Sequence, residues 1–498
     1  MKKLVACGLA AGLMAAGLLG GASGPALAAK NSGLIVGMVL EPPHLDPTAG
    51  AAAAIDEVVY ANIFEGLTRI DRNGEVKPAL AESWEVSDDG LTYTFKLHSG
   101  VTFHDGTTFD SADVKFSFDR AMAEDSTNAQ KSLFAPIAAV ETPDAGTVVI
   151  TLKQAAGNLL FNLGWGDAVI VAPESAAENK NTPIGTGPFK FGRWIKGDRI
   201  EMLINLKYWG DPAKLTSATI KIIPDPAAAT AAMLAGDVDA FPNFPAPEAI
   251  SLFDSDARFK VVIGSTEGET ILAMNNGRKP LNDIRVRRAL AHAIDRKAVI
   301  EGAMFGYGTP IGTHFAPHHP AYVDLTERYS YDQERAVALL GDAGFAEGLK
   351  LTLKLPPPSY ARRGGEVVAA QLASVGIETK IIQVEWSQWL DQVFKGKDYD
   401  LTIVSHTEPM DIGIYARKDY YFNYGGADFK ALMGKLNATV VEQDRYALLA
   451  KAQEKLAEDS VNVFLFQLAK HGVWKADVMG LWENSPVQAN DLSEVYWK

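Results

Sequence analysis

The chain alternates between strand-like and helix-like patterns along nearly its whole length. Residues 34–40 form a continuous apolar run, as a buried strand would. Residues 91–97 alternate threonine with apolar and aromatic side chains, which is typical of a half-buried antiparallel strand. Helical patterns lie between such strands, as in 285–300 and 440–457. This mixture predicts an α/β or α+β protein with more than one sheet.

Further elements follow the same two patterns. Strands are expected at 147–152, 190–204, 351–355, 378–384 and 399–404. Helices are expected at 52–64, from Ser111 onward with Ser111 as its cap, at 227–234 before Gly236, at 335–340 and at 365–374. No internal repeat or low-complexity linker separates these elements, so we expect domains joined by crossing strands.

The N-terminus has the pattern of a secretory signal. Lys2 and Lys3 precede an uncharged apolar stretch over 4–21, and Ala26-Leu27-Ala28 forms an A-x-A cleavage signal. The stretch is short for a membrane span, so we expect cleavage before Ala29. The segment around Cys7 looks like a lipoprotein box, but too few residues precede the cysteine for an apolar segment ahead of it.

Composition excludes several classes of function. Cys7 is the single cysteine of the 498 residues, so the mature chain has no disulfide, thiolate metal site or cysteine nucleophile. The formal net charge of −14 argues against a nucleic-acid partner, which needs a basic face. The sequence also lacks a G-x-S-x-G elbow, an H-E-x-x-H motif and a P-loop. Gly185-Thr186-Gly187-Pro188 has too few glycines for a phosphate loop and is interpreted as a turn.

One long segment has a distinctive order of elements. Residues 81–114 predict strand, tight turn, strand, turn and helix, with Asp89-Gly90 and Asp105-Gly106 as the turn dipeptides. Each of its residues has an ordinary structural explanation. Other short motifs accompany it in order: Leu45-Asp46-Pro47, Phe64-Glu65-Gly66-Leu67, Ile184-Gly185-Thr186-Gly187-Pro188-Phe189, Tyr208-Trp209, 234–239 and 280–296.

These segments together closely resemble the pattern of the family 5 extracellular solute-binding proteins, over nearly the whole mature chain. The resemblance implies an α/β fold like that of periplasmic binding proteins, with two lobes around a ligand cleft, joined by crossing strands. It implies a signal peptide over 1–28, lobe I over 29–59, 180–268 and 478–498, an extra subdomain of lobe I over 60–179, and lobe II over 269–477.

The resemblance also implies a function. The chain is expected to be a monomeric, non-enzymatic periplasmic protein that captures a peptide or peptide-like ligand. It would deliver this ligand to an ABC permease in the inner membrane, without a cofactor. The alternatives are the same fold with an opine, oligosaccharide or nickel chelate, a receptor or scavenger without a transporter, and a secreted hydrolase.

Candidate ligand contacts lie in two loops and one aromatic segment. Asp46 follows the first strand in a proline-rich loop, where a turn-capping role is the alternative. Trp386 would offer the ligand a flat apolar wall, unless it packs in the core as expected for Trp389. In peptide-binding members of the family an acid of the loop after residue 404 holds the α-ammonium, and here Glu408 or Asp411 could serve.

The segment 414–424 is rich in tyrosine and contains Arg417, which could pair with a ligand carboxylate. Tyr415 of this segment is a further candidate contact, and a buried aromatic cluster is the alternative. The histidines His314, His318 and His319 flank Pro317 without the spacing of a metal motif, so no metal site is predicted.

Overall fold

The computed structural model describes residues 32–50 and 52–498, and residues 32–498 form one compact unit. The predicted signal peptide, with Cys7 and the cleavage site, lies outside the described residues. Across the described ranges, no helix combines the length and the apolar character that crossing a membrane requires.

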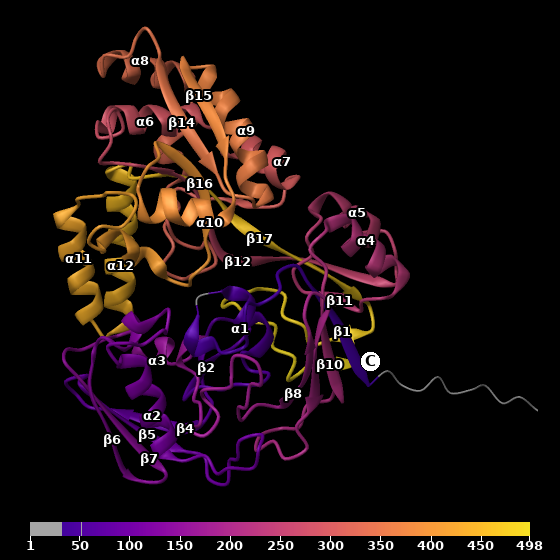
Figure 1. Cartoon of the computed structure of the whole chain (residues 1–498). Coiled ribbons are helices and arrows are strands. Elements are labelled where there is room, and N and C mark those ends of the chain that lie inside the picture. Colours follow the sequence, from indigo (N-terminus) through magenta and orange to yellow (C-terminus); the bar gives the residue numbers. More distant parts are fainter. Residues whose placement is uncertain (1–31, 51) are drawn as a thin grey trace, which may run out of the picture. The chain divides into compact units, whose positions relative to one another are not determined.

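An eleven-stranded sheet runs through both lobes of the fold, in the order β15-β14-β16-β12-β17-β11-β1-β10-β9-β8, with β13 beside β17 (Figure 1). The first-lobe strands are β1 (Gly33–Met38), β8 (Phe189–Ile195), β9 (Arg199–Ile204), β10 (Ser217–Ile222) and β11 (Ala240–Phe241). The second-lobe strands are β13 (Thr309–Pro310), β14 (Leu349–Leu355), β15 (Ile377–Gln383) and β16 (Leu401–His406).

Two long strands connect the lobes. β12 (Phe259–Met274) and β17 (Val463–Lys475) pair antiparallel over most of their length and continue from one half of the sheet into the other. Separate apolar cores pack on the two halves, one around Val36, Ile220 and Trp474 and one around Leu272, Leu353 and Ile403. The predicted arrangement of two lobes joined by crossing strands is therefore confirmed.

A smaller four-stranded sheet carries the long motif of residues 81–114. Its order is β4 (Ala81–Val86), β5 (Thr92–Leu97), β7 (Thr147–Leu152) and β6 (Ile137–Asp144), with α2 (Ser111–Met122) packed against it. This layer has its own core around Phe95, Phe118 and Ile150, as expected for an extra subdomain. The exact limits of the lobes and of the subdomain stay a prediction.

Short ribbons and helices complete the fold. The ribbons are β2 (Thr68–Ile70) with β3 (Val76–Pro78) and β18 (Val478–Met479) with β19 (Tyr496–Trp497). The first-lobe helices are α1 (Ala53–Val59), α3 (Leu159–Asn162), α4 (Pro226–Ala235) and α5 (Ile250–Asp254). The second-lobe helices are α6 (Ile284–Ala293), α7 (Arg296–Met304), α8 (Gln333–Asp342), α9 (Ser359–Ala373), α10 (Trp386–Trp389), α11 (Ala427–Ala438) and α12 (Glu442–Glu458).

Two helix boundaries differ from the prediction for a local reason. The helix predicted over 285–300 is interrupted at Ile294, which is extended, and α7 begins after Asp295, whose side chain accepts from the amides of Lys297 and Ala298. Asp110 caps α2 in place of Ser111, because its carboxylate accepts from the Ala112 amide while Asp113 accepts from the Asp110 amide.

The short family motifs meet around one carboxylate of the first lobe. Glu65 accepts hydrogen bonds from Thr186 Oγ1 at 2.7 Å, Tyr208 Oη at 2.7 Å and Trp209 Nε1 at 2.9 Å. Gly187 belongs to the same junction, where a Cβ would lie 2.5 Å from the carbonyl oxygen of Asn62. The motifs at 64–67, 184–189 and 208–209 are distant in the sequence but form one hydrogen-bonded junction, so their role is structural. A structural role is also what the interpretation of 185–188 as a turn predicts.

Candidate functional site

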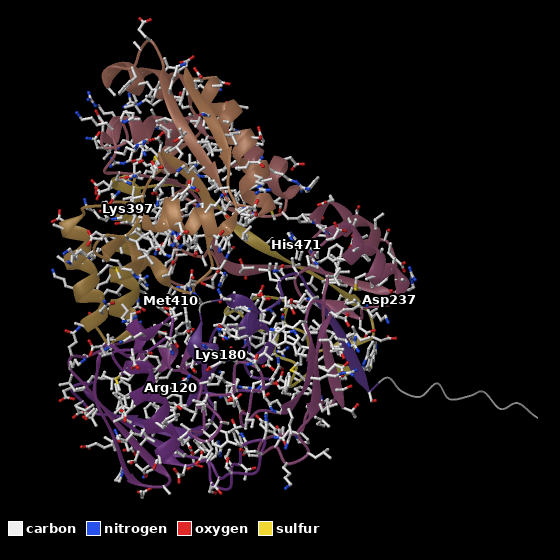
Figure 2. All side chains as sticks on the ribbon, in the orientation of Figure 1. Arg120, Lys180, Asp237, Lys397, Met410 and His471 are labelled. Carbon is white, nitrogen blue, oxygen red and sulfur yellow. The ribbon has the colours of Figure 1, made fainter. Side chains whose placement is uncertain are left out.

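The acidic loop that follows β16 contains both acids that the sequence singles out. Glu408 is partly buried and accepts from the amide of Thr407 at 3.2 Å. Met410, labelled in Figure 2, has a left-handed backbone with φ of 54° and turns the chain into a 3₁₀ helix, η7 (Asp411–Ala416). This turn directs Asp411 into the second lobe while Glu408 stays at its margin.

Asp411 lies between two histidines from different strands and loops. His314 Nε2 lies 2.6 Å from Asp411 Oδ1, and His406 Nδ1 lies 3.4 Å from Oδ2, without the geometry of a hydrogen bond. The Asp411 side chain is 8% exposed. Burial acting by itself would raise the pKa of Asp411, but the adjacent histidines His314 and His406 lower it below its usual range. Asp411 therefore stays charged.

Glu269 lies on the crossing strand β12 beside this group. It follows a register shift in the pairing with β17, it is 4% exposed, and its Oε2 has no hydrogen-bond partner. Burial raises the pKa of Glu269 well above its usual value, and the charges of Asp411 and Glu267 raise it further. One ligand atom each from Glu269, His314 and Asp411 lie within 4.8 Å of one another.

The first lobe presents a second pair of carboxylates. Asp56 lies on α1, and Asp167 lies on a 3₁₀ helix, η3 (Gly166–Ala168). Oδ1 of each acid is buried without a hydrogen-bond partner, as is the indole Nε1 of Trp165. Burial raises the pKa of Asp167 to about 7, and the charge of Glu408 in the second lobe raises it as well. Burial also raises the pKa of Asp56, with a further contribution from Asp167.

The two lobes meet at these acids. A gap of about 20 Å³, room for about one water molecule, is lined by Asp56, Trp165 and Gly166 from one side and by Pro409 from the other. Gln488 Nε2 donates to Thr407 Oγ1 at 2.9 Å across the same boundary. At this point the contact between the lobes leaves no room for a solute larger than water.

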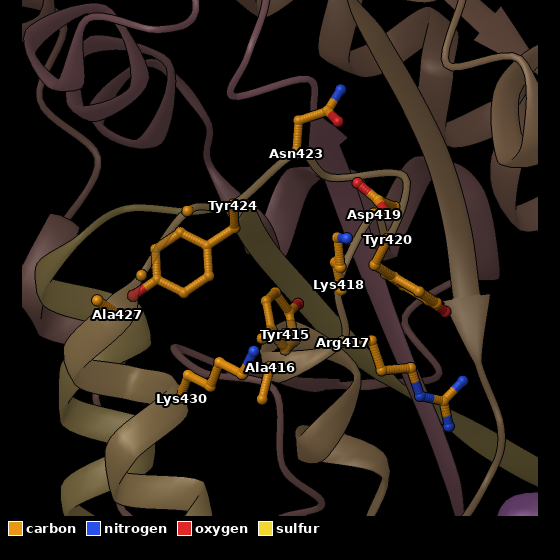
Figure 3. A pocket seen from close by; sticks show the side chains of 12 residues that line it. Tyr415, Ala416, Arg417, Lys418, Asp419, Tyr420, Asn423, Tyr424, Ala427 and Lys430 are labelled. Carbon is orange, nitrogen blue, oxygen red and sulfur yellow. The ribbon is translucent and has the colours of Figure 1, made fainter.

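The tyrosine-rich segment lines a larger hollow of about 410 Å³ (Figure 3). Figure 3 shows Arg417 and Tyr420 at one side of it and Tyr424 and Lys430 at the other. The Arg417 guanidinium lies 5.7 Å from the Tyr420 ring and has no carboxylate partner among the described residues. Tyr415 is buried, and its hydroxyl lies 3.2 Å from His314 Nδ1 and accepts from Asn462 at 3.0 Å.

The remaining candidates differ in exposure. Trp386 is 43% exposed and stacks on the buried Trp389, with ring centroids 5.1 Å apart. Asp46 is fully buried, its Oδ2 lies 3.1 Å from Arg120 Nη2, and its Oδ1 accepts from the Thr48 amide at 2.9 Å. The capping alternative for Asp46 is thus realised, while contact of either residue with a ligand stays a prediction.

The structure brings four of the six predicted residues into one region. Glu408, Asp411, Tyr415 and Arg417 follow one another on the acidic loop and the segment after it. Sequence reasoning missed residues that share this region or face it: Asp56, Trp165, Asp167, Glu269 and His406. Their local patterns are those of an ordinary helix, turn or strand, so no signal in one sequence marks them.

Comparison with known proteins places this geometry in a family. The sequence signature described as "Bacterial extracellular solute-binding proteins, family 5 Middle" matches residues 75–426. The chain belongs to this family. It is therefore a solute-binding protein of the type that serves ABC importers, as the sequence predicts.

Curated relatives and solved structures agree with the family assignment. The chain is 33% identical over 395 residues to the glutathione-binding protein GsiB of Salmonella paratyphi A, covering 78% of this chain and 74% of the relative. GsiB of Escherichia coli K12 is 32% identical over 393 residues, covering 77% and 74%.

Among solved family 5 structures, Helicobacter pylori DppA with the peptide STSA has a TM-score of 0.83 at 25% identity, covering 94% of this chain and 98% of that one. Bacillus subtilis AppA with a nonapeptide has a TM-score of 0.82 at 25% identity, covering 94% and 99%.

Proposed function

We propose that the protein captures a small peptide-like solute with a primary ammonium group between its lobes and passes it to an ABC importer. The observation that carries this proposal is the set of facing acids. Asp56 of the first lobe lines the gap opposite Pro409 of the second lobe, and Asp167 lies near enough to Glu408 for that charge to raise its pKa. None of the three acids forms an ion pair with a lysine or arginine among residues 32–50 and 52–498.

An ammonium group fits this arrangement on physical grounds. It offers three hydrogen-bond donors, and carboxylates taken out of water require a cation or donors. Contacts to Asp167 and Glu408 together form only when the lobes are closed, so binding of the ammonium group would favour closure. The sequence leaves open whether Glu408 or Asp411 contacts the amine. We propose Glu408, because His314 and His406 already contact Asp411.

The other end of the solute is proposed to lie toward the tyrosine-rich segment. Arg417 would pair with a carboxylate, and exposed Trp386 would give an apolar wall. Asp46 and Tyr415 would support the binding surface without touching the solute. Arg120 already pairs with Asp46, and the Tyr415 hydroxyl already contacts His314. The names of the relatives, which bind glutathione or peptides, support a ligand with both an amine and a carboxylate.

We further propose that the protein catalyses no reaction, works as a monomer without a cofactor, and acts in the periplasm after removal of residues 1–28. The names of family members as binding proteins support the first point, and one of them is called periplasmic. The partner would be an inner-membrane permease of the ABC type.

A ligand screen tests the proposal. The mature protein, freed of bound solute by unfolding and refolding, is tested by thermal shift in EDTA with glutathione, di- to pentapeptides, opines and oligosaccharides. Nickel chelates are tested separately in buffer without EDTA. Ligand at 100 times Kd stabilises the fold by about 2.7 kcal/mol, which moves the melting midpoint measurably. We expect a shift with a peptide-like solute and its loss when the amine is acetylated.

Variants then assign the contact. Glu408→Gln keeps the size of the side chain and removes its charge, and we expect about tenfold weaker binding, equivalent to about 1.4 kcal/mol. Asp391→Asn, an exposed acid whose side chain is 73% accessible, is the matched control. Equal binding of the acetylated and free solutes, or equal affinity of Glu408→Gln and the control, would contradict the ammonium contact.

A further inference from the structure

A second site lies behind the acidic loop, within the second lobe. We propose that Glu269, His314, His406 and Asp411 bind one divalent transition-metal ion, of the zinc, nickel or copper type. These side chains come from β12, from the loop after β13, from the end of β16 and from the start of η7. The fold thus brings Glu269 and His314 to the neighbouring residues His406 and Asp411, which are far from both in the sequence.

The ligand atoms are close enough to surround an ion. Atoms of Glu269, His314 and Asp411 lie within 4.8 Å of one another, and so do atoms of His406, Glu408 and Asp411. Ligand atoms of a four-coordinate ion with bonds of about 2.0 to 2.1 Å lie about 3.3 Å apart, so the two groups, which share Asp411, would have to move inward for all four side chains to bind one ion. Two imidazole nitrogens with two carboxylates are a donor set for zinc, nickel or copper, whereas magnesium and calcium prefer oxygen alone.

Two buried carboxylate oxygen atoms of the group have no hydrogen-bond donor. Glu269 Oε2 and Asp411 Oδ2 are both shielded from solvent and have no hydrogen-bond partner. Glu269 is 4% exposed and the Asp411 side chain 8%. No lysine or arginine forms an ion pair with either acid in the described part of the chain. Buried carboxylate oxygens without donors are costly unless a cation is bound.

The histidines are also held as metal ligands usually are. His314 presents Nε2 to Asp411, and its other nitrogen lies 3.2 Å from the Tyr415 hydroxyl. His406 presents Nδ1 to Asp411, and its Nε2 lies 2.9 Å from the Tyr421 hydroxyl. A hydrogen-bond partner on the far nitrogen fixes the tautomer and the ring orientation, and this support is typical of metal-binding histidines. The sequence grouped His314 with His318 and His319, whereas the structure groups it with His406.

The ammonium contact uses Asp56, Asp167 and Glu408, and of these Glu408 also lies within 4.8 Å of the metal ligands His406 and Asp411, so the two proposals are tested apart through Asp167. The metal site is built by the protein itself and needs no solute. Metal binding is therefore measured without solute, and the solute screen is run in EDTA. An Asp167→Asn variant should weaken solute binding and leave metal affinity unchanged within about threefold, so the failure of either proposal is recognised independently.

The experiment is a titration of the mature, chelator-stripped protein with Zn²⁺, Ni²⁺ and Cu²⁺ in a calorimeter, with Mg²⁺ as a control. We expect one equivalent of a transition metal to bind with a Kd in the micromolar range or tighter, and no binding of Mg²⁺. The spectrum of bound Cu²⁺ in electron paramagnetic resonance should show the hyperfine pattern of two imidazole nitrogens. His314→Gln should weaken binding by at least about 100-fold, and Tyr415→Phe by about tenfold.

His292→Gln is the matched control, because His292 lies on α6 and its ring bonds the Ser330 carbonyl, outside this group. If His314→Gln does not fold, the near-isosteric Glu269→Gln replaces it, with an expected loss of at least tenfold. Absence of binding, equal affinity in His314→Gln and His292→Gln, or a copper spectrum without imidazole nitrogens would each overturn the proposal.

Discussion

Glu65 and Glu269 are both inward-facing glutamates, yet their surroundings are opposite. Glu65, at the junction of the family motifs, accepts three hydrogen bonds from Thr186, Tyr208 and Trp209. Glu269, on the crossing strand β12, has one oxygen without a hydrogen-bond partner. The charges of Asp411, Glu267 and Glu408 lie close enough to raise its pKa. A satisfied acid stabilises the fold, whereas an unsatisfied one costs free energy that a bound cation would recover.

The difference shows which residues a family pattern reports. The motifs around Glu65 have a structural role in the first lobe of this chain. The acids proposed to bind the solute, Asp56, Asp167 and Glu408, and Glu269, proposed to bind a metal ion, lie outside these motifs. Four predictions test this contrast between satisfied and unsatisfied groups.

The largest effect is expected at the satisfied acid. Glu65→Ala leaves Thr186, Tyr208 and Trp209 without their shared acceptor and should lower the free energy of unfolding by about 3 kcal/mol. Solute affinity should not change. Urea denaturation measures the first quantity and calorimetry the second, with exposed Glu124→Ala as control. A loss below about 1 kcal/mol would show that the junction is not structural.

The same contrast extends to a buried base. His471, labelled in Figure 2 on β17, is 4% exposed, and its Nε2 has no partner. Burial lowers the pKa of His471 from 6.5 to about 4. A lowered histidine pKa means that the unfolded chain binds the proton first, so stability present above pH 6.5 is lost as the pH falls toward 4.

His471→Phe keeps the aromatic packing against Tyr307 and removes the proton site. Between pH 7 and pH 4 this variant should lose about 3 kcal/mol less unfolding free energy than the wild type, from a pKa difference of about 2.5. Denaturant midpoints at the two pH values measure the difference. An identical loss of unfolding free energy in variant and wild type between pH 7 and pH 4 would show that His471 does not contribute to acid destabilisation.

An unsatisfied acid should behave in the opposite way to Glu65. Asp167→Asn removes a buried carboxyl with a pKa raised to about 7, so the unfolding free energy above pH 7 should rise by about 1 kcal/mol. Binding of the amine-bearing solute should weaken about tenfold at the same time. If Asp167→Asn is less stable than the wild type and binds the amine-bearing solute equally well, Asp167 has a structural role like that of Glu65 and does not contact the solute.

The smallest effect is expected at Arg417, which is exposed and has no ion-pair partner in the described chain. Arg417→Ala should change the unfolding free energy by no more than about 0.5 kcal/mol. It should weaken a solute with a free carboxylate about fivefold and leave its amidated form unaffected. Competition calorimetry compares the two solutes, and equal losses for both would exclude a contact with the carboxylate.

The sequence predicts the architecture well because local patterns determine it. The apolar run at β1 and the alternation in β5 follow directly from the period of a strand. Gly236 ends α4 in the left-handed conformation, as its position after an alanine-rich helix indicates. The sequence pattern does not indicate the break at Ile294, because the helical period of apolar residues continues through it and Asp295 resembles an ordinary polar residue of a helix.

The candidate site is only partly predictable because its parts come from four separate segments. Glu408 and Asp411 could be found from the acidic loop, but which of them already has a partner depends on His406 and on His314, which is distant in the sequence. Asp56 resembles any acid on a short helix. The need for a glycine at position 166 becomes clear only from the structure, since a Cβ there would lie 2.1 Å from Asp56 Oδ1.

The register shift between Ser265 and Glu269 has a mechanical consequence. The irregular turn of β12 lies on a strand that connects the lobes, and Glu269 extends from it. A cation bound by Glu269, as proposed above, would therefore be attached directly to one of the two strands that link the lobes. Metal binding and the opening or closing of the lobes would then depend on the same strand.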